Sequence, residues 1–101
     1  MKTGESLIWV IYDIASDKKR TAAAKACLEA GLYRVQKSVF LGSIQSSRLD
    51  ELALQIEALI DPEKDRVYLF PMCEVDFKKV ILKGQAFDAE LVRDEVRNLF
   101  L

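Results

Sequence analysis

The chain has 101 residues, half of them hydrophobic, which is enough for one modest core and too little for two domains. Fifteen Lys and Arg against sixteen Asp and Glu give a net charge of -1, which argues against a protein that coats nucleic acid or a membrane with its whole surface. Any basic site must therefore be local.

The apolar run that begins at Leu7 ends at Asp13, so it is too short for a signal peptide or a membrane span, and we expect a cytoplasmic protein that does not contact a membrane. The chain has no His, and Cys27 and Cys73 lack zinc-motif spacing. This pattern argues against the common zinc sites and against His-based acid-base catalysis. We expect both cysteines to be reduced and packed.

Residues 7–14 form an apolar run, with Asp13 as its one charged residue, rich in β-branched and aromatic side chains, which predicts a strand buried on both faces at the centre of a sheet. Ser16 suits an N-cap and Gly31 a C-cap, so a first helix is predicted over 17–30. Residues 33–44 favour β-structure but are long for one strand. They either bend at a bulge or form two short strands.

A second helix is predicted after a serine cap at Ser46 or Ser47, with apolar residues at helical spacing and with Pro62 ending it. The apolar residues are Leu49, Leu52, Ala53, Ile56, Leu59 and Ile60. Residues 66–72 predict a strand at a sheet edge or strand end, because Pro71 lacks a backbone donor.

A further short strand is predicted over 80–84, followed by a tail over 85–101. Asp88 is a candidate N-cap of an amphipathic helix in this tail, which we expect to bind a groove on a partner or subunit. The apolar residues of that helix are Leu91, Val92, Val96, Leu99 and Phe100.

The first strand is apolar at both parities, whereas two helices cover only one face of a small sheet. Its second face requires either the C-terminal tail or a partner subunit, and a homodimer meeting sheet to sheet accounts for the pattern most simply. Two Asp13 carboxylates facing across such a two-fold axis are suited to Mg²⁺, a hard cation that prefers oxygen ligands.

Basic residues gather in the first half of the chain. Residues 17–42 carry a net charge of +4 and residues 43–65 a net charge of -4. Amides at a helix N-terminus also favour anions, so phosphate is the natural partner of the basic part, and a solvated face without a ligand is the alternative. The candidate nucleic-acid-binding residues are Lys18, Lys19, Arg20, Lys25, Arg34 and Lys37.

The blocks VIYDIASDKKR and GLYRVQKSVFLG, with VDFKKVILKG further on, resemble the signature of CRISPR-associated protein two, Cas two (Cas2). The resemblance implies a ferredoxin-like βαββαβ fold over 1–84 with an antiparallel sheet, a sheet-to-sheet homodimer and an extra C-terminal strand that crosses to the partner. It implies that Asp13 binds a divalent metal at the dimer axis. The resemblance also implies that five residues lie near a nuclease site, at positions that match the family: Tyr12, Arg20, Arg34, Ser38 and Phe40.

Each site residue also has a structural alternative. Asp13 is able to bond the amides that open the first helix, and Phe40 suits the core. On an alternating strand Gln36 and Ser38 share a face and reach the end of the first strand together. Without a base such as His, Ser38 suits positioning of water or phosphate better than nucleophilic attack. Arginine suits phosphate because a guanidinium binds two oxygens at once.

Three functions follow as hypotheses. The resemblance favours a homodimeric adaptor of the spacer-acquisition complex, which binds duplex DNA beside the Cas one (Cas1) integrase and reads the backbone rather than the sequence. The second is a Mg²⁺-dependent endonuclease that cleaves DNA or single-stranded RNA, with Asp13 as metal ligand and Arg20 or Arg34 stabilising charge. The third is a ferredoxin-like toxin-type ribonuclease or regulatory domain unrelated to CRISPR.

Overall fold

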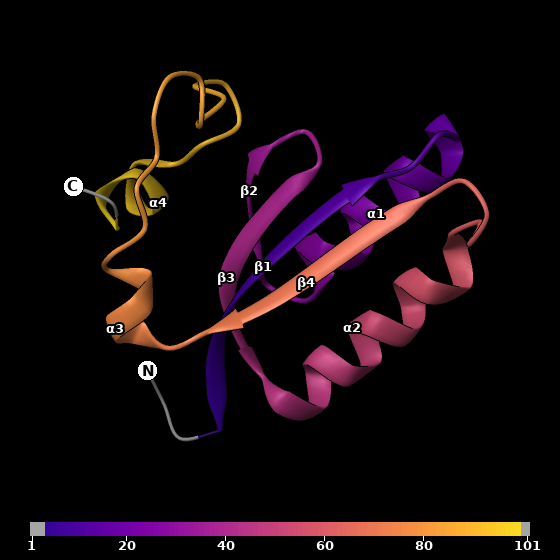
Figure 1. The fold of residues 1–101 in the computed structure, drawn as a ribbon, viewed down its shortest axis with the longest axis horizontal. Helices are drawn as coiled ribbons and strands as arrows, with labels where there is room; N and C mark the ends of the chain where they lie inside the picture. The colour runs from indigo at the N-terminus through magenta and orange to yellow at the C-terminus, as the bar shows by residue number, and fades with distance from the viewer. Residues whose placement is uncertain (1–3, 100–101) are drawn as a thin grey trace.

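The computed structural model describes residues 4–99, which form one antiparallel sheet with two helices on one of its faces (Figure 1). The strands lie in the order β2-β3-β1-β4. In chain order the elements are β1 (Glu5–Asp13), α1 (Asp17–Glu29), β2 (Tyr33–Gln36), β3 (Val39–Gln45), α2 (Ser46–Leu59), β4 (Arg66–Met72), α3 (Glu74–Phe77) and α4 (Asp94–Asn98). The predicted α+β class and the central position of the first strand are confirmed.

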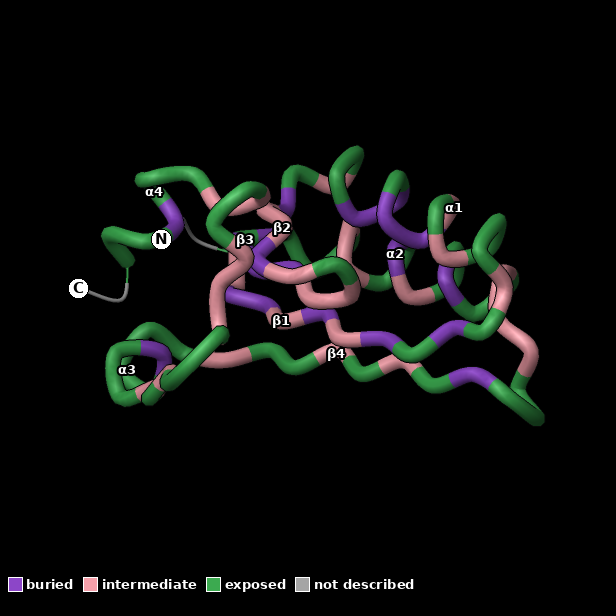
Figure 2. Tube along the Cα trace, turned by 90° about the horizontal axis from the view of Figure 1, so that it is seen from above, coloured by how far each residue is buried: buried purple, intermediate pink, exposed green. Residues whose placement is uncertain are grey.

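The core lies between the sheet and the pair α1 and α2, which form a separate layer in the view from above (Figure 2). Ile8, Val10 and Phe40 are fully buried there. Burial of a large apolar side chain contributes about 1.5–3 kcal/mol relative to exposure. The buried face of α1 consists of Ala23, Ala24, Ala26 and Cys27. These small side chains let α1 pack close to the sheet, which positions its first turn beside the end of β1.

The N-cap of α1 is Ser16, as predicted, whereas the C-cap is Ala30 and the predicted Gly31 lies one residue beyond it. The Ser16 hydroxyl accepts a hydrogen bond from the Lys19 amide at 3.3 Å, and Gly31 has a φ of 87°, which favours glycine just past a helix end. The serine cap predicted for α2 is wrong. The chain passes directly from β3 into α2, so Gln45 is the N-cap without a side-chain bond, and the Ser46 hydroxyl donates to the Gly4 carbonyl instead.

Residues 33–44 form two strands, which decides between the two alternatives left by the sequence. The chain reverses at Lys37 and Ser38, and the β2–β3 register is irregular between Arg34 and Gln36. The bulge and the turn therefore occur together. Pro71 lies in β4, which pairs only with β1 at the sheet edge, as predicted.

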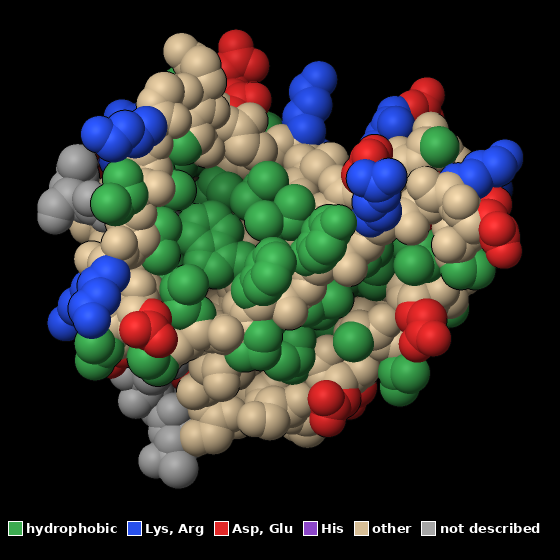
Figure 3. All heavy atoms as spheres, in the orientation of Figure 1, with side chains coloured by type: hydrophobic (Ala, Val, Ile, Leu, Met, Phe, Trp, Pro, Cys, Tyr) green, Lys and Arg blue, Asp and Glu red, His purple; other side chains and the backbone are tan. Residues whose placement is uncertain are grey.

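The second face of the sheet is covered at one end and open elsewhere. Phe77 and Val96, from the segment after β4, are buried with Leu7, Val35 and Leu41. Beyond this cluster the face is apolar and accessible. Tyr68 and Phe70 on β4 are each 47% exposed, and Trp9 and Ile11 on β1 are half-buried. Figure 3 looks onto this face, where hydrophobic side chains form a central group with charged side chains at its margins. We call it the open face.

Two predictions for the C-terminal part are wrong. Residues 80–84 do not form a strand, because the turn of α3 leads the chain away from the β4 edge and towards α4 (Figure 1). The single tail helix is replaced by a turn after Asp88 and the short α4, because the extended backbone of Arg93 interrupts the helix. Phe100 lies outside the described residues.

The tail is anchored to β2 of its own chain. The Asp88 amide donates to the Val35 carbonyl at 2.9 Å, and the Gln36 side chain donates to the Gln85 carbonyl. The Arg93 guanidinium lies 5.8 Å from the centre of the Tyr33 ring. These contacts explain why residues 88–92 form a turn beside β2 instead of a continuous helix.

Candidate functional site

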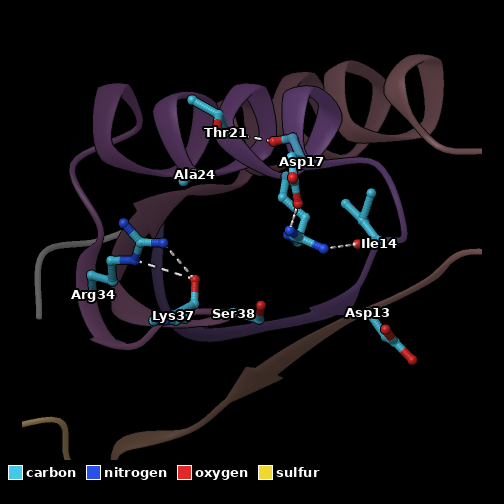
Figure 4. Close-up of a pocket in the computed structure, with 9 residues that line it drawn as sticks. Asp13, Ile14, Asp17, Thr21, Ala24, Arg34, Lys37 and Ser38 are labelled. Atoms are coloured by element: carbon cyan, nitrogen blue, oxygen red, sulfur yellow. Dashed lines mark hydrogen bonds and ion pairs between the residues drawn. The ribbon is translucent and has the colours of Figure 1, made fainter.

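A cavity of about 570 Å³ lies between α1, the turn that joins β2 to β3, and the end of β1 (Figure 4). It is lined by Asp13, Ile14, Asp17, Arg20, Thr21, Ala24, Arg34, Lys37 and Ser38. Four of the six predicted site residues, Asp13, Arg20, Arg34 and Ser38, therefore meet at one cavity, although they are far apart in the sequence.

Asp13 ends β1 and is exposed. In Figure 4 its side chain points away from Arg34, Lys37 and Ser38. The alternative role for Asp13, bonding the amides that open α1, is wrong, because Ser16 caps the helix and the Asp65 carboxylate accepts from the amide of Ala15. The Asp13 carboxylate is left without a hydrogen bond or ion pair to residues 4–99.

The carbonyl oxygen of Lys37 is the centre of the β2–β3 turn. It accepts hydrogen bonds from Arg34 through Nη2 at 2.7 Å and Nε at 3.2 Å, and a third from the Tyr12 hydroxyl at 3.3 Å. The Tyr12 amide donates to the Ser38 carbonyl at 3.0 Å. The turn is thus fixed to the end of β1, and with it the position of Ser38.

Tyr12 and Phe40 form the floor beneath Arg34. Their rings stack with centroids 6.1 Å apart, and the Arg34 guanidinium lies 5.5 Å from the Phe40 ring centre. Phe40 is fully buried, in agreement with the core role. Tyr12 is 4% exposed, and burial raises the pKa of its hydroxyl. Both aromatics support the cavity from below and do not line it.

Arg20 braces the loop between β1 and α1. Its Nη1 donates to the Ile14 carbonyl at 3.0 Å and to the Ala15 carbonyl at 3.3 Å, and its Nη2 forms an ion pair with Asp17. Several donors of this guanidinium are therefore satisfied within the chain. Arg34 donates from Nε and Nη2 to the Lys37 carbonyl. Its Nη1 makes no hydrogen bond within residues 4–99 and is therefore available to a ligand.

The six predicted cations do not form one patch. Arg20, Arg34 and Lys37 line the cavity. Lys25 lies 3.9 Å from Glu29 and lines a groove between α1 and α2, and Lys18 is about two helical turns before it, on the same side of α1. The positive charge of Lys19 acts on Asp65. The cations therefore surround the first turns of α1 on different sides.

The expectation that Gln36 and Ser38 share a face is wrong. Because the chain reverses between them, Gln36 pairs with Val39 and its side chain bonds the Gln85 carbonyl, whereas Ser38 lines the cavity. Cys27 is buried, and burial raises the pKa of its thiol to about 12. Cys73, expected to be packed, is exposed, because it precedes α3 at the end of an edge strand, and its thiol donates to Asp76.

Asp65 is a residue that sequence reasoning missed. It is 9% exposed, and its two carboxylate oxygens accept from the amides of Ala15 at 3.0 Å and Asp61 at 2.8 Å. These bonds, led by that from Asp61, lower the pKa of Asp65 below its ordinary value. In the sequence DPEKDR it resembles any acidic turn residue, so no signal separates it from Asp61.

The described residues do not form a complete metal site within one chain. Across residues 4–99 no group of three or more His, Cys, Asp or Glu side chains is placed to hold a metal ion. The Asp13 carboxylate is the right donor type for Mg²⁺ but supplies too few ligands by itself. A divalent ion at this position would need further ligands that the side chains of residues 4–99 of one chain do not supply.

A model of the family CRISPR associated protein Cas2 matches residues 6–80, which run from the second residue of β1 past α3 and include the whole cavity. The chain belongs to the Cas2 family. A CRISPR-associated endoribonuclease Cas2 of Korarchaeum cryptofilum is 32% identical over 78 residues, which cover 77% of this chain and 84% of that relative. The alternative of a domain unrelated to CRISPR is therefore wrong.

Two solved structures are similar to this Cas2 chain. A hypothetical protein from Thermus thermophilus is 31% identical, with a TM-score of 0.64 over 69% of this chain and 84% of that one. The Cas2 of Streptococcus pyogenes is 24% identical, with a TM-score of 0.67 over 77% of this chain and 99% of that one, and its likeness concerns the fold. Among residues 4–99 no helix has the length and apolar character needed to cross a membrane.

Proposed function

We propose that this Cas2 chain is a homodimeric adaptor of the spacer-acquisition complex in antiviral defence, binding duplex DNA beside a Cas1 integrase. The observation that carries the proposal is the open face, which leaves Tyr68 and Phe70 about half exposed next to Trp9 and Ile11. Contiguous exposed apolar surface of this kind marks an interaction site. A second copy meeting it sheet to sheet would bury these side chains in an isologous contact.

The ferredoxin-like assignment belongs to this proposal. The chain order β1-α1-β2-β3-α2-β4 and the strand order β2-β3-β1-β4 support it, because two βαβ-type halves then place both helices on one face. The opposite face is left for a partner. Residues 1–84 would constitute the domain and residues 85–101 a tail that binds a partner such as the integrase.

Duplex binding is supported by the cations around α1. Arg34 and Lys37 border the cavity, and Lys18 is exposed on the first turn of α1. In a two-fold dimer each group would occur twice, at two separate positions along a duplex. Guanidinium and ammonium groups bind phosphate oxygens regardless of base, so we expect binding that is independent of sequence and weakens with salt.

A Mg²⁺-dependent endonuclease is the second candidate function. Two observations favour it: the free Asp13 carboxylate at the end of β1, and the name endoribonuclease carried by the Korarchaeum relative. Two Asp13 carboxylates from a dimer would hold the ion, which when bound supplies Lewis-acid stabilisation of a phosphodiester. Arg34 and Arg20 would orient the phosphate, and Ser38 would position water or a phosphate oxygen.

The test separates the two functions. Purified protein is titrated with a labelled 30-base-pair duplex, and cleavage of duplex DNA and single-stranded RNA is measured with Mg²⁺ or chelator, for wild type and Asp13→Ala. We expect Asp13→Ala to abolish metal-dependent cleavage and to leave duplex affinity unchanged. Loss of duplex binding together with cleavage would contradict the adaptor function. Glu57→Ala, which removes an exposed acid on α2 outside the cavity lining, is the matched control.

A further inference from the structure

We propose that Asp65 is a positioning residue of this site, holding the loop between β1 and α1 so that Asp13 and Arg20 keep their relative places. The inference rests on the proposed function, in which Asp13 binds a divalent ion. It starts from a contact across fifty sequence positions, in which Asp65 Oδ1 accepts from the Ala15 amide at 3.0 Å.

Asp65 is itself held firmly. Its second oxygen, Oδ2, accepts from the Asp61 amide at 2.8 Å, and its own amide donates to the Asp61 carbonyl at 2.8 Å. These reciprocal bonds close a short loop between α2 and β4. Both carboxylate oxygens are thereby used, one on each side, so the side chain joins two loops as a fixed acceptor.

The contact extends the pairing of β1 with β4 past its last residues. The register ends with Asp13 opposite Arg66, and Asp65 immediately precedes Arg66. Two residues beyond Asp13, the Ala15 amide donates to the side-chain carboxylate of Asp65, whereas in a continued strand it would donate to a backbone carbonyl. The peptide group between Ile14 and Ala15, one residue after Asp13, is thus held in place.

The same loop is held from its other side by Arg20. Its Nη1 donates to the carbonyls of Ile14 and Ala15, while Asp65 accepts from the Ala15 amide. The peptide groups between Asp13 and the start of α1 are therefore secured by one acid and one base. Removing the Asp65 carboxylate releases the Ala15 amide. Within residues 4–99, the Arg20 guanidinium is then the side chain that still bonds these peptide groups.

The experiment uses full-length Asp65→Asn, in which one oxygen remains and an NH₂ group meets the other amide. Asp65→Ser, with one hydroxyl acceptor, is the second variant if Asp65→Asn does not unfold cooperatively. Glu63→Gln, an exposed acid in the same loop, is the matched control. Backbone order parameters of residues 13–16, hydrogen exchange of the Ala15 amide and Mn²⁺ affinity are measured for each.

We expect the order parameters of residues 13–16 to fall from about 0.85 to below about 0.6 in Asp65→Asn. The Ala15 amide should exchange at least about tenfold faster, and Mn²⁺ affinity should fall about tenfold, with Glu63→Gln unchanged. Unchanged order and exchange would overturn the proposal, as would greater loop mobility with wild-type Mn²⁺ affinity. If wild type binds no Mn²⁺, the proposed metal site is contradicted independently of the proposal for Asp65. The order parameters of Asp13 alone then decide whether Asp65 positions it.

Discussion

Asp13 and Arg66 face each other as the last register pair of β1 and β4, at the margin of the open face. Both side chains are exposed, and no ion pair joins them within residues 4–99. Directly opposed residues of antiparallel strands have their Cβ atoms about 4.5–5.5 Å apart. A cation bound at Asp13 would therefore lie in the field of the Arg66 guanidinium.

The first prediction concerns this opposing charge. Arg66→Gln should tighten Mn²⁺ binding about two- to fivefold, because two like charges at such a distance repel by about 1 kcal/mol in a highly hydrated setting. Calorimetric titration of Mn²⁺ measures the change. Lys64→Gln removes the same charge from the neighbouring loop and should have a smaller effect. Weaker metal binding by Arg66→Gln would show that Arg66 supports the site instead.

The second prediction tests the open face. Tyr68→Asp should weaken the dimer at least about a hundredfold, since an interface aromatic often contributes about 2 kcal/mol and occurs twice across a two-fold axis. Sedimentation velocity over a range of concentrations measures the equilibrium. Leu54→Asp is the control, because Leu54 is 65% exposed but lies on α2, behind the sheet. A Tyr68→Asp protein as dimeric as wild type would argue against a contact through this face.

The third prediction concerns Arg34. A lysine cannot reproduce the two parallel donors that meet the Lys37 carbonyl, so Arg34→Lys should lower the free energy of unfolding by about 1 kcal/mol. It should also weaken duplex binding several-fold. Urea unfolding and fluorescence anisotropy measure the two effects. Lys25→Gln, which leaves the cavity intact, should weaken the duplex without loss of stability, and equal destabilisation by both would contradict the role given to Arg34.

The pattern of apolar residues and the residues typical of helix ends allowed most of the fold to be predicted. Apolar runs locate β1 and β4, and Ser16 with Gly31 sets the ends of α1, because these signals are local. The failures lie where tertiary contacts decide. Residues 80–84 have strand composition, but α3 leads the chain away from the β4 edge before them, and the docking of Asp88 on Val35 competes with helix formation after it.

The candidate site shows the same contrast between local sequence signals and tertiary contacts. Asp13 and Arg34 were predicted by residue type and resemblance, and both border the cavity. Tyr12, expected near the nuclease site, lies beneath the cavity, where it is buried and its hydroxyl donates to the Lys37 carbonyl. Asp65 was missed because its partner, the Ala15 amide, is fifty positions away. A sequence states which groups are chemically able to act, and only packing determines which of them face outward.

The fourth prediction compares the two cysteines. Burial raises the pKa of Cys27 to about 12, whereas Cys73 is exposed, and the thiolate is the reactive form. A disulfide reagent at pH 8 should therefore modify one thiol rapidly in the folded protein and two in denaturant. Cys73→Ser should abolish the rapid reaction, and Cys27→Ser should leave it intact. Rapid loss of both thiols in the folded protein would show that the core around Cys27 opens readily.

The fifth prediction is a loss of stability in acid that depends on Asp65. Its pKa lies below the ordinary 3.8 because the amides of Asp61 and Ala15 bond the charged form. The unfolded chain therefore takes up a proton at a higher pH than the folded chain does. The resulting stability is complete above pH 3.8 and is lost as the pH falls from there through the folded pKa.

Thermal unfolding between pH 6 and pH 2 measures this contribution. Wild type and Glu63→Gln should lose melting temperature more steeply below about pH 4 than Asp65→Asn, which is less stable at neutral pH and approaches wild type in acid. A constant difference between wild type and Asp65→Asn across the range would mean that Asp65 acts by shape alone. A difference that is present near neutral pH and disappears in acid carries the opposite meaning: the charge on the Asp65 carboxylate is what secures the loop after Asp13.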